Sequence, residues 1–126
     1  MTWIVAFHEE FDAEFEELAV EVQEELLAQA KVVEHFGPQT GRPRVDTLHG
    51  SQYANMKELR FEAADGVWRV AFAFDPRRRA ILLVAGDKSG VSEKRFYRQL
   101  IAKADERYRR HLRGLSARRG EGKKPS

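Results

Sequence analysis

The stretch MKELRFEAADGVWRVAFAF, residues 56–74, decides the fold class. Apolar and polar side chains alternate along residues 56–62 and again along residues 67–74, which is the period of two β-strands that each pack one face against a core. Between them, Ala64-Asp65-Gly66 is a typical hairpin turn signal. The stretch therefore predicts two antiparallel strands whose bulky apolar side chains share one face.

Arg60 and Arg69 lie on the opposite face of this hairpin, beside small or apolar side chains. Because few large side chains occupy that face, the pattern predicts a shallow open surface there rather than a second core. Guanidinium groups bind phosphate through paired hydrogen bonds, so two of them side by side favour a phosphate site. The structural alternative is that each arginine pairs with a neighbouring acid, such as Glu58 or Glu62 for Arg60.

Elements on both sides extend the hairpin into a sheet with a helical layer. After a turn at Asp75-Pro76-Arg77, residues 80–85 (AILLVA) are apolar on both sides and predict an inner strand, and residues 3–7 predict a first strand. Residues 11–36 repeat apolar side chains at steps of three, four or seven. This spacing predicts a helix, broken near residues 17–20, that covers the bulky face of an antiparallel meander.

The C-terminal part of the chain predicts a second amphipathic helix. Ser92 is a suitable N-cap, Glu93 complements the helix dipole, and the apolar stripe ends near residues 112–114. Residues 114–126 are basic and rich in glycine and serine, so we expect a disordered tail. The sequence therefore predicts one α+β domain, residues 1–113, in which helices pack on an antiparallel sheet.

Composition and charge limit the class of protein. A chain of 126 residues without cysteine fits one globular domain without disulfides, and we expect it in the cytoplasm. Its N-terminus lacks the basic start of a signal peptide, and no apolar run reaches membrane-spanning length. Residues 1–41 hold ten acids and one base, a net charge of −9, whereas residues 42–126 hold ten acids and 21 bases, +11. This asymmetry favours a basic surface for a polyanion; the alternative is mutual attraction of the two halves.

Candidate site residues occur around the hairpin and in the turn-rich connection before it, residues 37–55, which includes one brief strand near residues 45–48. The set consists of Arg60, Arg69 and Lys88, with His49, Gln52, Tyr53 and Lys57 nearby in sequence. Preorganised arginine and lysine side chains stabilise the negative charge that a phosphodiester gains in its pentavalent transition state. Such a site needs no metal when the adjacent ribose 2′-OH is the nucleophile.

Signatures of other enzyme classes are absent from the sequence. It contains no P-loop, G-x-S-x-G, HExxH or Rossmann motif. Its four histidines, His8, His35, His49 and His111, lack the spacing of metal ligands, so neither a metal nor another cofactor is expected. His49 is of interest because it lies in the loop that leads into the hairpin; the simpler alternative is an exposed loop histidine.

Three stretches in this order resemble the phage-derived, HigB-like branch of the RelE/ParE toxin superfamily. They are LHGSQYANMKELRF (residues 48–61), VWRVAFAFDPRRRAILLVAGDKSG (residues 67–90) and RFYRQLIAKADERY (residues 95–108). The resemblance covers about residues 1–113. It implies the compact RelE fold, with helices on one face of a twisted antiparallel sheet and substrate bound on the other.

The resemblance also implies a function. It implies a toxin of a type II toxin–antitoxin pair that cleaves mRNA, usually on the ribosome, and is neutralised by a small helix-turn-helix antitoxin. Promoter DNA would be contacted through the antitoxin complex, and no membrane is involved. ParE-like toxins of the same superfamily instead poison DNA gyrase without catalysis, and fold alone does not separate the two. A third alternative is a nucleic-acid-binding accessory protein without catalysis.

Carried over to this sequence, the resemblance implies roles for individual residues. Arg60 of ELR, Arg69 of the W-R strand and Lys88 of the GDK turn match basic positions associated with RNA binding and catalysis. Tyr97 or Tyr108 would supply an aromatic ring that stacks on a base. Related toxins often end with a tyrosine or histidine just after the last strand, whereas this chain continues into a helix and a basic tail. The general base is therefore left open between His49 and Lys88. The acidic first helix is expected to face away from RNA and to help dock the antitoxin.

Overall fold

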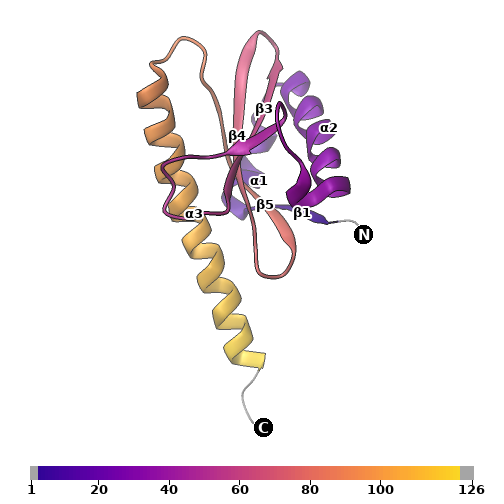
Figure 1. Cartoon of the computed structure of the whole chain (residues 1–126), viewed down its shortest axis with the longest axis vertical. Helices are drawn as coiled ribbons and strands as arrows, with labels where there is room; N and C mark the ends of the chain where they lie inside the picture. Colours follow the sequence, from indigo (N-terminus) through magenta and orange to yellow (C-terminus); the bar gives the residue numbers. More distant parts are fainter. Residues whose placement is uncertain (1–2, 123–126) are drawn as a thin grey trace.

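The computed structural model describes residues 3–122, in which two groups of helices enclose a five-stranded sheet (Figure 1). In chain order the elements are β1 (Ile4–Phe7), α1 (Glu9–Glu16), α2 (Val20–Phe36), a short 3-10 helix (Gly37–Gln39), β2 (Val45–Thr47), β3 (Met56–Ala63), β4 (Gly66–Phe74), β5 (Arg79–Asp87) and α3 (Glu93–Gly122). The α+β class predicted from the sequence is confirmed, as are the strand near residues 45–48 and the break between the first two helices.

The sheet has the strand order β1-β5-β4-β3-β2. Strands β2 to β5 pair antiparallel with their neighbours, which confirms the predicted meander. Strand β1, however, pairs parallel with β5, so the sheet is mixed rather than wholly antiparallel. Side-chain alternation carries no information about the direction of a partner strand that lies more than 70 residues away in the chain. A parallel pair needs a long crossover, and here the segment from α1 to β4 supplies it.

The residues that predict the two hairpin turns give them the expected backbone geometry and hydrogen bonds. Ala64 and Asp65 join β3 to β4 with φ of 50° and 63°, as a two-residue hairpin turn requires. The register places Arg60 directly opposite Arg69. At the next turn, Oδ1 of Asp75 accepts hydrogen bonds from the backbone N–H groups of Arg77 and Arg79, each at 2.9 Å. The sequence prediction that the two arginines are cross-strand neighbours is therefore confirmed.

Helices α1 and α2 cover the bulky face of the sheet and form the first core. Phe11 of α1 and Leu26 of α2 are at most 1% exposed and belong to one cluster with Phe72 of β4. The remaining stripe residues of the two helices, Phe15, Leu18, Val22 and Val33, pack in the same cluster. Gly37, with φ of 57°, ends α2, and its N–H donates to the carbonyl of Val33. The predicted helical layer is therefore confirmed.

The opposite face of the sheet is largely covered by α3, so the predicted open surface is wrong over most of that face. Ala71 and Ala73 are completely buried beneath α3, in a second core that includes Leu100 and Ala104. Small side chains on a sheet allow a helix to approach closely, and a Cβ added at Gly86 would lie 2.8 Å from the ring of Phe96. The alanines that suggested an empty surface in fact make room for a helix.

Helix α3 starts as predicted and ends later than predicted. Its first turn is capped by Ser92, whose Oγ accepts from the N–H of Arg95 at 3.1 Å. The helix continues through Gly114 to Gly122, beyond the predicted end near residues 112–114. One glycine costs a helix only about 1 kcal/mol, which is too little to end it without a further stop signal. The predicted disorder of residues 123–126 concerns residues outside the described part of the chain.

Ion pairs join the acidic and basic halves of the chain. Arg107 of α3 is 6% exposed, and its Nη1 and Nη2 donate to the two carboxylate oxygens of Glu14 of α1 at 2.8 and 2.5 Å. Its Nη1 also donates to the carbonyl of Leu83 at 2.7 Å, and Arg110 pairs with Glu10. The hydrogen bonds from Arg107 lower the pKa of Glu14. The two halves therefore attract each other through α1, whereas the acids of α2 lie outside these pairs.

Candidate functional site

A groove lined by four arginines lies at the β2 edge of the sheet. It has a volume of about 410 Å³, and its lining residues are Arg42, Pro43, Arg44, Arg60, Phe61, Glu62, Val67 and Arg69. We refer to it as the arginine groove. The cross-strand pair Arg60 and Arg69 contributes from β3 and β4, and the loop before β2 contributes the other two arginines. Four guanidinium groups around one carboxylate form a surface suited to a phosphate backbone.

The side chain of Arg60 forms part of the rim of the groove. It is 30% exposed, and its Nη1 lies 3.8 Å from Oδ2 of Asp46 on β2. The same carboxylate oxygen lies 3.6 Å from Nε of Arg42, whose side chain is 74% exposed. Such exposed pairs contribute little to stability. Both arginines can therefore exchange Asp46 for an anionic ligand at small cost.

Arg69, by contrast, is buried and held from several sides. Its Nε donates to Oη of Tyr97 at 3.2 Å and lies 3.5 Å from Oε1 of Glu58, while its Nη1 donates to the carbonyl of Trp68 at 2.9 Å. Tyr97 in turn donates to Glu58 at 2.7 Å. Burial and the hydrogen bond with Glu58 raise the pKa of Tyr97, so the hydroxyl keeps its proton at neutral pH. Arg69 thus pairs with a neighbouring acid, as the structural alternative predicted, and still lines the groove.

Lys88 lies beside the groove but does not line it. Its backbone N–H donates to the carbonyl of Val67 at 2.8 Å, which places it at the same end of the sheet. Its Nζ donates to Oε1 of Glu93 at 3.1 Å, and the side chain is 23% exposed. The lysine can reach a ligand in the groove only by leaving Glu93.

The remaining predicted site residues lie away from the groove. Lys57 is on the other face of β3 and its Nζ donates to Thr47 at 3.4 Å, while His49 is exposed in the turn after β2. Tyr53 packs edge-on against Tyr108 with the ring centroids 5.0 Å apart. Gln52 donates its backbone N–H to Asp105 at 3.0 Å. Tyr108 follows Tyr97 by eleven residues, about 16 Å along α3. The structure therefore brings Arg60, Arg69 and Tyr97 together and separates the other residues from them.

Arg42 and Arg44 are functional candidates that the sequence patterns did not single out. They flank a proline in the segment GRPR before β2. The backbone N–H of Arg60 donates to the carbonyl of Arg44 at 2.7 Å, which continues the β2–β3 ladder and holds the loop against the groove. The signal that could have found them is the register of β2 against β3, which a strand of three residues does not reveal on its own.

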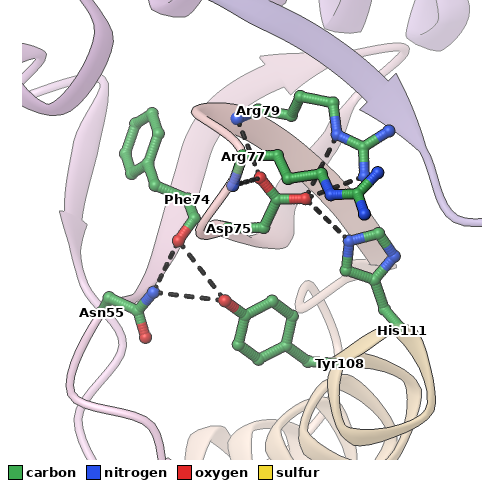
Figure 2. A network of polar contacts seen from close by, with 7 residues as sticks. All are labelled: Asn55, Phe74, Asp75, Arg77, Arg79, Tyr108 and His111. Atoms are coloured by element: carbon green, nitrogen blue, oxygen red, sulfur yellow. Dashed lines mark hydrogen bonds and ion pairs between the residues drawn. The ribbon is translucent and has the colours of Figure 1, made fainter. Parts of the chain in front are cut away.

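A second polar network joins the turn after β4 to α3 at the other end of the sheet (Figure 2). Asn55 and Tyr108 both donate to the carbonyl of Phe74, at 2.7 and 3.3 Å. Oδ2 of Asp75 accepts from Nε and Nη2 of Arg79, at 3.2 and 3.0 Å, and lies 2.9 Å from Nε2 of His111. Burial alone would raise the pKa of Asp75, but these hydrogen bonds and those from backbone N–H groups outweigh it and lower the pKa.

Among the side chains that the structure describes, those of residues 3–117, no three histidine, cysteine or acidic groups come together in a way that could hold a metal ion. None of the helices in this same range combines the length and the apolar character needed to cross a membrane.

Known proteins with similar sequences support the resemblance described above. The chain is similar to the putative toxin HigB2 of Mycobacterium tuberculosis (strain ATCC 25618 / H37Rv), with 44% identity over 93 residues that make up 73% of this chain and 46% of that protein. It is also similar to the putative toxin HigB3 of the same strain, with 50% identity over 76 residues, 60% of this chain and 64% of that protein. The chain thus matches about half to two thirds of the length of these curated relatives.

A solved structure and a family match complete the comparison. The fold is similar to that of a mutant of the E. coli toxin RelE in the free state, with a TM-score of 0.58 over 82% of this chain and 97% of that one. At 14% identity this likeness concerns the fold alone, and it confirms the predicted RelE-like arrangement. Residues 13–109 match the family described as phage derived protein Gp49-like (DUF891). The predicted resemblance to phage-derived, HigB-like toxins is confirmed, and the chain belongs to this Gp49-like family.

Proposed function

We propose that the protein is the toxin of a type II toxin–antitoxin pair and acts as a metal-independent mRNA endoribonuclease. The observation that carries the proposal is the arginine groove, where four arginines line one hollow of about 410 Å³ on a RelE-like fold. The relatives named putative toxins HigB2 and HigB3 support the toxin class. Cleavage of mRNA, with the ribosome as the expected place, would stop translation and growth.

The groove suits a phosphodiester whose own ribose supplies the nucleophile. The 2′-oxygen attacks the adjacent phosphorus, the bond to the 5′-oxygen breaks, and the products are a 2′,3′-cyclic phosphate and a 5′-hydroxyl. Negative charge grows on the non-bridging oxygens during attack, and Arg60 and Arg69 supply fixed donors for it. The buried position of Arg69 means that its guanidinium is already oriented by Tyr97 and Glu58 before RNA binds.

The proton of the 2′-OH must pass to a base, and the leaving 5′-oxygen must gain one. Glu62 is the acidic residue that lines the arginine groove, and it is exposed, so we assign it the role of base. Lys88, at the same end of the sheet, would stabilise charge or donate the second proton after leaving Glu93. His49 lies in the turn after β2 and is a weaker candidate than the sequence indicated.

The neutralising antitoxin, for which we propose a helix-turn-helix protein, would dock on the outer face of α2. Glu10 and Glu14 of α1 are engaged by α3, which leaves α2 as the acidic helix free for a partner. Two of its apolar side chains seven residues apart, Val20 and Leu27, lie on one side of the helix and are 61% and 45% exposed. An acidic face with apolar patches fits a basic amphipathic segment of the partner. This surface lies across the sheet from α3 (Figure 1).

The test is mutation of the arginine groove with RNA cleavage as the readout. Arg60→Ala should lower mRNA cleavage by about 100-fold, as is typical when one donor to a transition state is lost. Cleavage is measured by mapping new 5′ ends in a translation extract and by growth after induction. Arg60 is the best position because its side chain is 30% exposed and its removal should leave the fold intact, which circular dichroism verifies.

The matched control is Arg109→Ala, which removes an exposed arginine of α3 outside the groove. The control should keep full toxicity. A folded Arg60→Ala variant that still cleaves mRNA would refute the assignment of the groove. If induction causes DNA breaks and an SOS response while mRNA stays intact, the protein is a gyrase poison instead. Salt-dependent RNA binding without any cleavage would identify a non-catalytic binding protein.

A further inference from the structure

A second hollow lies at the opposite edge of the sheet from the arginine groove. It has a volume of about 560 Å³ and opens between the end of β1, the start of β5 and the C-terminal half of α3. Its lining includes the apolar residues Ala6 and Ile81 and two small residues of α3, Gly114 and Ala117. A hollow of this size falls within the range of roughly 300–1,000 Å³ that is typical of ligand pockets. We refer to it as the β1 cleft.

His8 contributes an N–H donor to the β1 cleft. Its Nδ1 accepts a hydrogen bond from the backbone N–H of Glu10 at 3.1 Å, so the proton of the neutral ring is on Nε2. Burial lowers the pKa of His8, which keeps the ring neutral at pH 7. The residue is 8% exposed, and Nε2 makes no hydrogen bond with residues 3–117, whose side chains the structure describes. Solvent reaches Nε2, because it is not among the buried polar atoms without a partner, and a phosphate oxygen in the cleft can replace water as its acceptor.

Two further side chains of the β1 cleft are fixed in place by Asp75. The side chain of Asp75 is completely buried, and it holds both Arg79 and His111 through the hydrogen bonds shown in Figure 2. Because the same carboxylate also accepts two backbone N–H groups, its position is fixed from several directions. Both held side chains line the cleft. Both side chains are therefore preorganised, so less side-chain conformational entropy is lost when a ligand binds.

The positive and negative side chains around the β1 cleft nearly balance, which favours a ligand with one phosphate over an anion with many charges. Arg79 and Arg110 bring positive charge, but Asp75 pairs with the first and Glu10 with the second. Glu9 also lines the cleft. With these charges nearly balanced, binding must come from directed hydrogen bonds and apolar contact. A nucleotide offers both, because its phosphate accepts hydrogen bonds and its ribose and base cover apolar surface.

We propose that the β1 cleft binds one nucleotide of RNA, at a site separate from the arginine groove and without a catalytic role. The phosphate accepts hydrogen bonds from His8 and Arg110, and the sugar and base contact Ala6 and Ile81, while the Nε2–H of His111 stays with Asp75. This inference rests on the proposed function, because it takes RNA as the substrate. Contacts at both edges of the sheet would fix the orientation of the RNA across the protein.

The test uses the purified full-length chain and two probes, uridine 5′-monophosphate and a short single-stranded RNA. His8→Asn keeps a side-chain oxygen that caps α1 and removes the Nε2 donor. Ala117→Trp fills the cleft, and its matched control Ala102→Trp places the same side chain at an exposed position of α3 outside the cleft. NMR shifts locate the site, and fluorescence anisotropy measures the affinity for the RNA.

Both probes should shift the resonances of His8, His111 and Gly114 in the unmodified chain. His8→Asn and Ala117→Trp should each weaken RNA binding by about tenfold, which corresponds to one lost hydrogen bond, and Ala102→Trp should not. RNA affinity within twofold of normal in both cleft variants would overturn the proposal, as would shifts caused by the mononucleotide but not by RNA. The Arg60→Ala variant distinguishes the catalytic role of the arginine groove from RNA binding in the β1 cleft. If this variant no longer cleaves RNA but RNA still shifts the resonances of the cleft residues, both proposals are supported. If it still cleaves RNA, only the catalytic role of the groove is refuted.

Discussion

The hydroxyl of Tyr97 should set both the stability of the domain and the position of Arg69, and Tyr97→Phe tests this. The substitution keeps the ring, which packs at the edge of the second core, and removes one oxygen. That oxygen donates to Glu58 at 2.7 Å and accepts from Arg69 at 3.2 Å. If Tyr97 acted only by stacking on a base, phenylalanine would replace it without loss.

The expected cost follows from the groups that lose a partner. A hydrogen bond to a charged group is worth about 1.5–3 kcal/mol. Glu58 is 8% exposed and keeps Arg69 at 3.5 Å, while Arg69 keeps its bond to the carbonyl of Trp68. Both charges therefore remain partly compensated, and we expect a loss of about 2 kcal/mol in the free energy of unfolding. For a domain of this size, that corresponds to a fall in Tm of about 8 °C.

Thermal melts and urea denaturation measure this change, followed by the fluorescence of the two tryptophans. The matched control is Tyr53→Phe, because the ring of Tyr53 packs against the same core and its hydroxyl makes no hydrogen bond with the side chains described, those of residues 3–117. That control should change the free energy of unfolding by less than about 0.5 kcal/mol. RNA cleavage by Tyr97→Phe should fall as well, since Arg69 loses one of the groups that orient it. A Tm within 2 °C of normal together with unchanged cleavage would refute the positioning role.

Other consequences of the structure can be measured in the same way. Arg107→Ala should destabilise the fold by about 3 kcal/mol in urea denaturation, because Glu14 and a buried carbonyl lose their donor, whereas exposed Arg109→Ala should stay within about 0.5 kcal/mol. Asp75 has a lowered pKa, so its stabilisation is complete above the unfolded pKa of about 4 and is lost as pH falls through the lower folded value. The Asp75→Asn variant should therefore have a lower Tm than the unmodified chain at pH 7. Its Tm should also fall less steeply as the pH is lowered, which thermal melts at a series of pH values measure. Leu27→Arg should weaken antitoxin binding at least tenfold in calorimetry while toxicity stays unchanged, and equal binding would exclude α2 as the docking surface.

Local patterns in the sequence predicted most of the fold, because the elements in question carry their own signals. The hairpin of β3 and β4 has strict alternation and a two-residue turn, and α2 ends at a glycine with positive φ. What failed depends on distant partners. Alternation does not state whether β1 runs parallel to β5, and small residues such as Ala71 fit an open face and a helix-covered face equally well.

The candidate site was predictable to the extent that it follows strand register. Arg60 and Arg69 are cross-strand neighbours as alternation requires, but their different burial depends on where α3 lies. His49 and Lys57 are close to Arg60 in sequence, yet a turn places one away from the groove and alternation places the other on the opposite face. Arg44 enters the groove through the pairing of a strand of three residues, which has too little pattern to fix its register.

Helix α3 explains why the two arginines of the hairpin are not equivalent. Its first turns bring Tyr97 over Arg69, so this guanidinium is buried, paired and oriented, while Arg60 lies beyond the helix on an exposed rim. A phosphate entering the groove would thus meet one fixed donor and one movable donor. The fixed donor cannot be removed without cost to the fold, whereas the movable donor can. For this reason loss of toxicity in a variant of Arg69 is ambiguous, and Arg60 is the position at which function and stability can be separated.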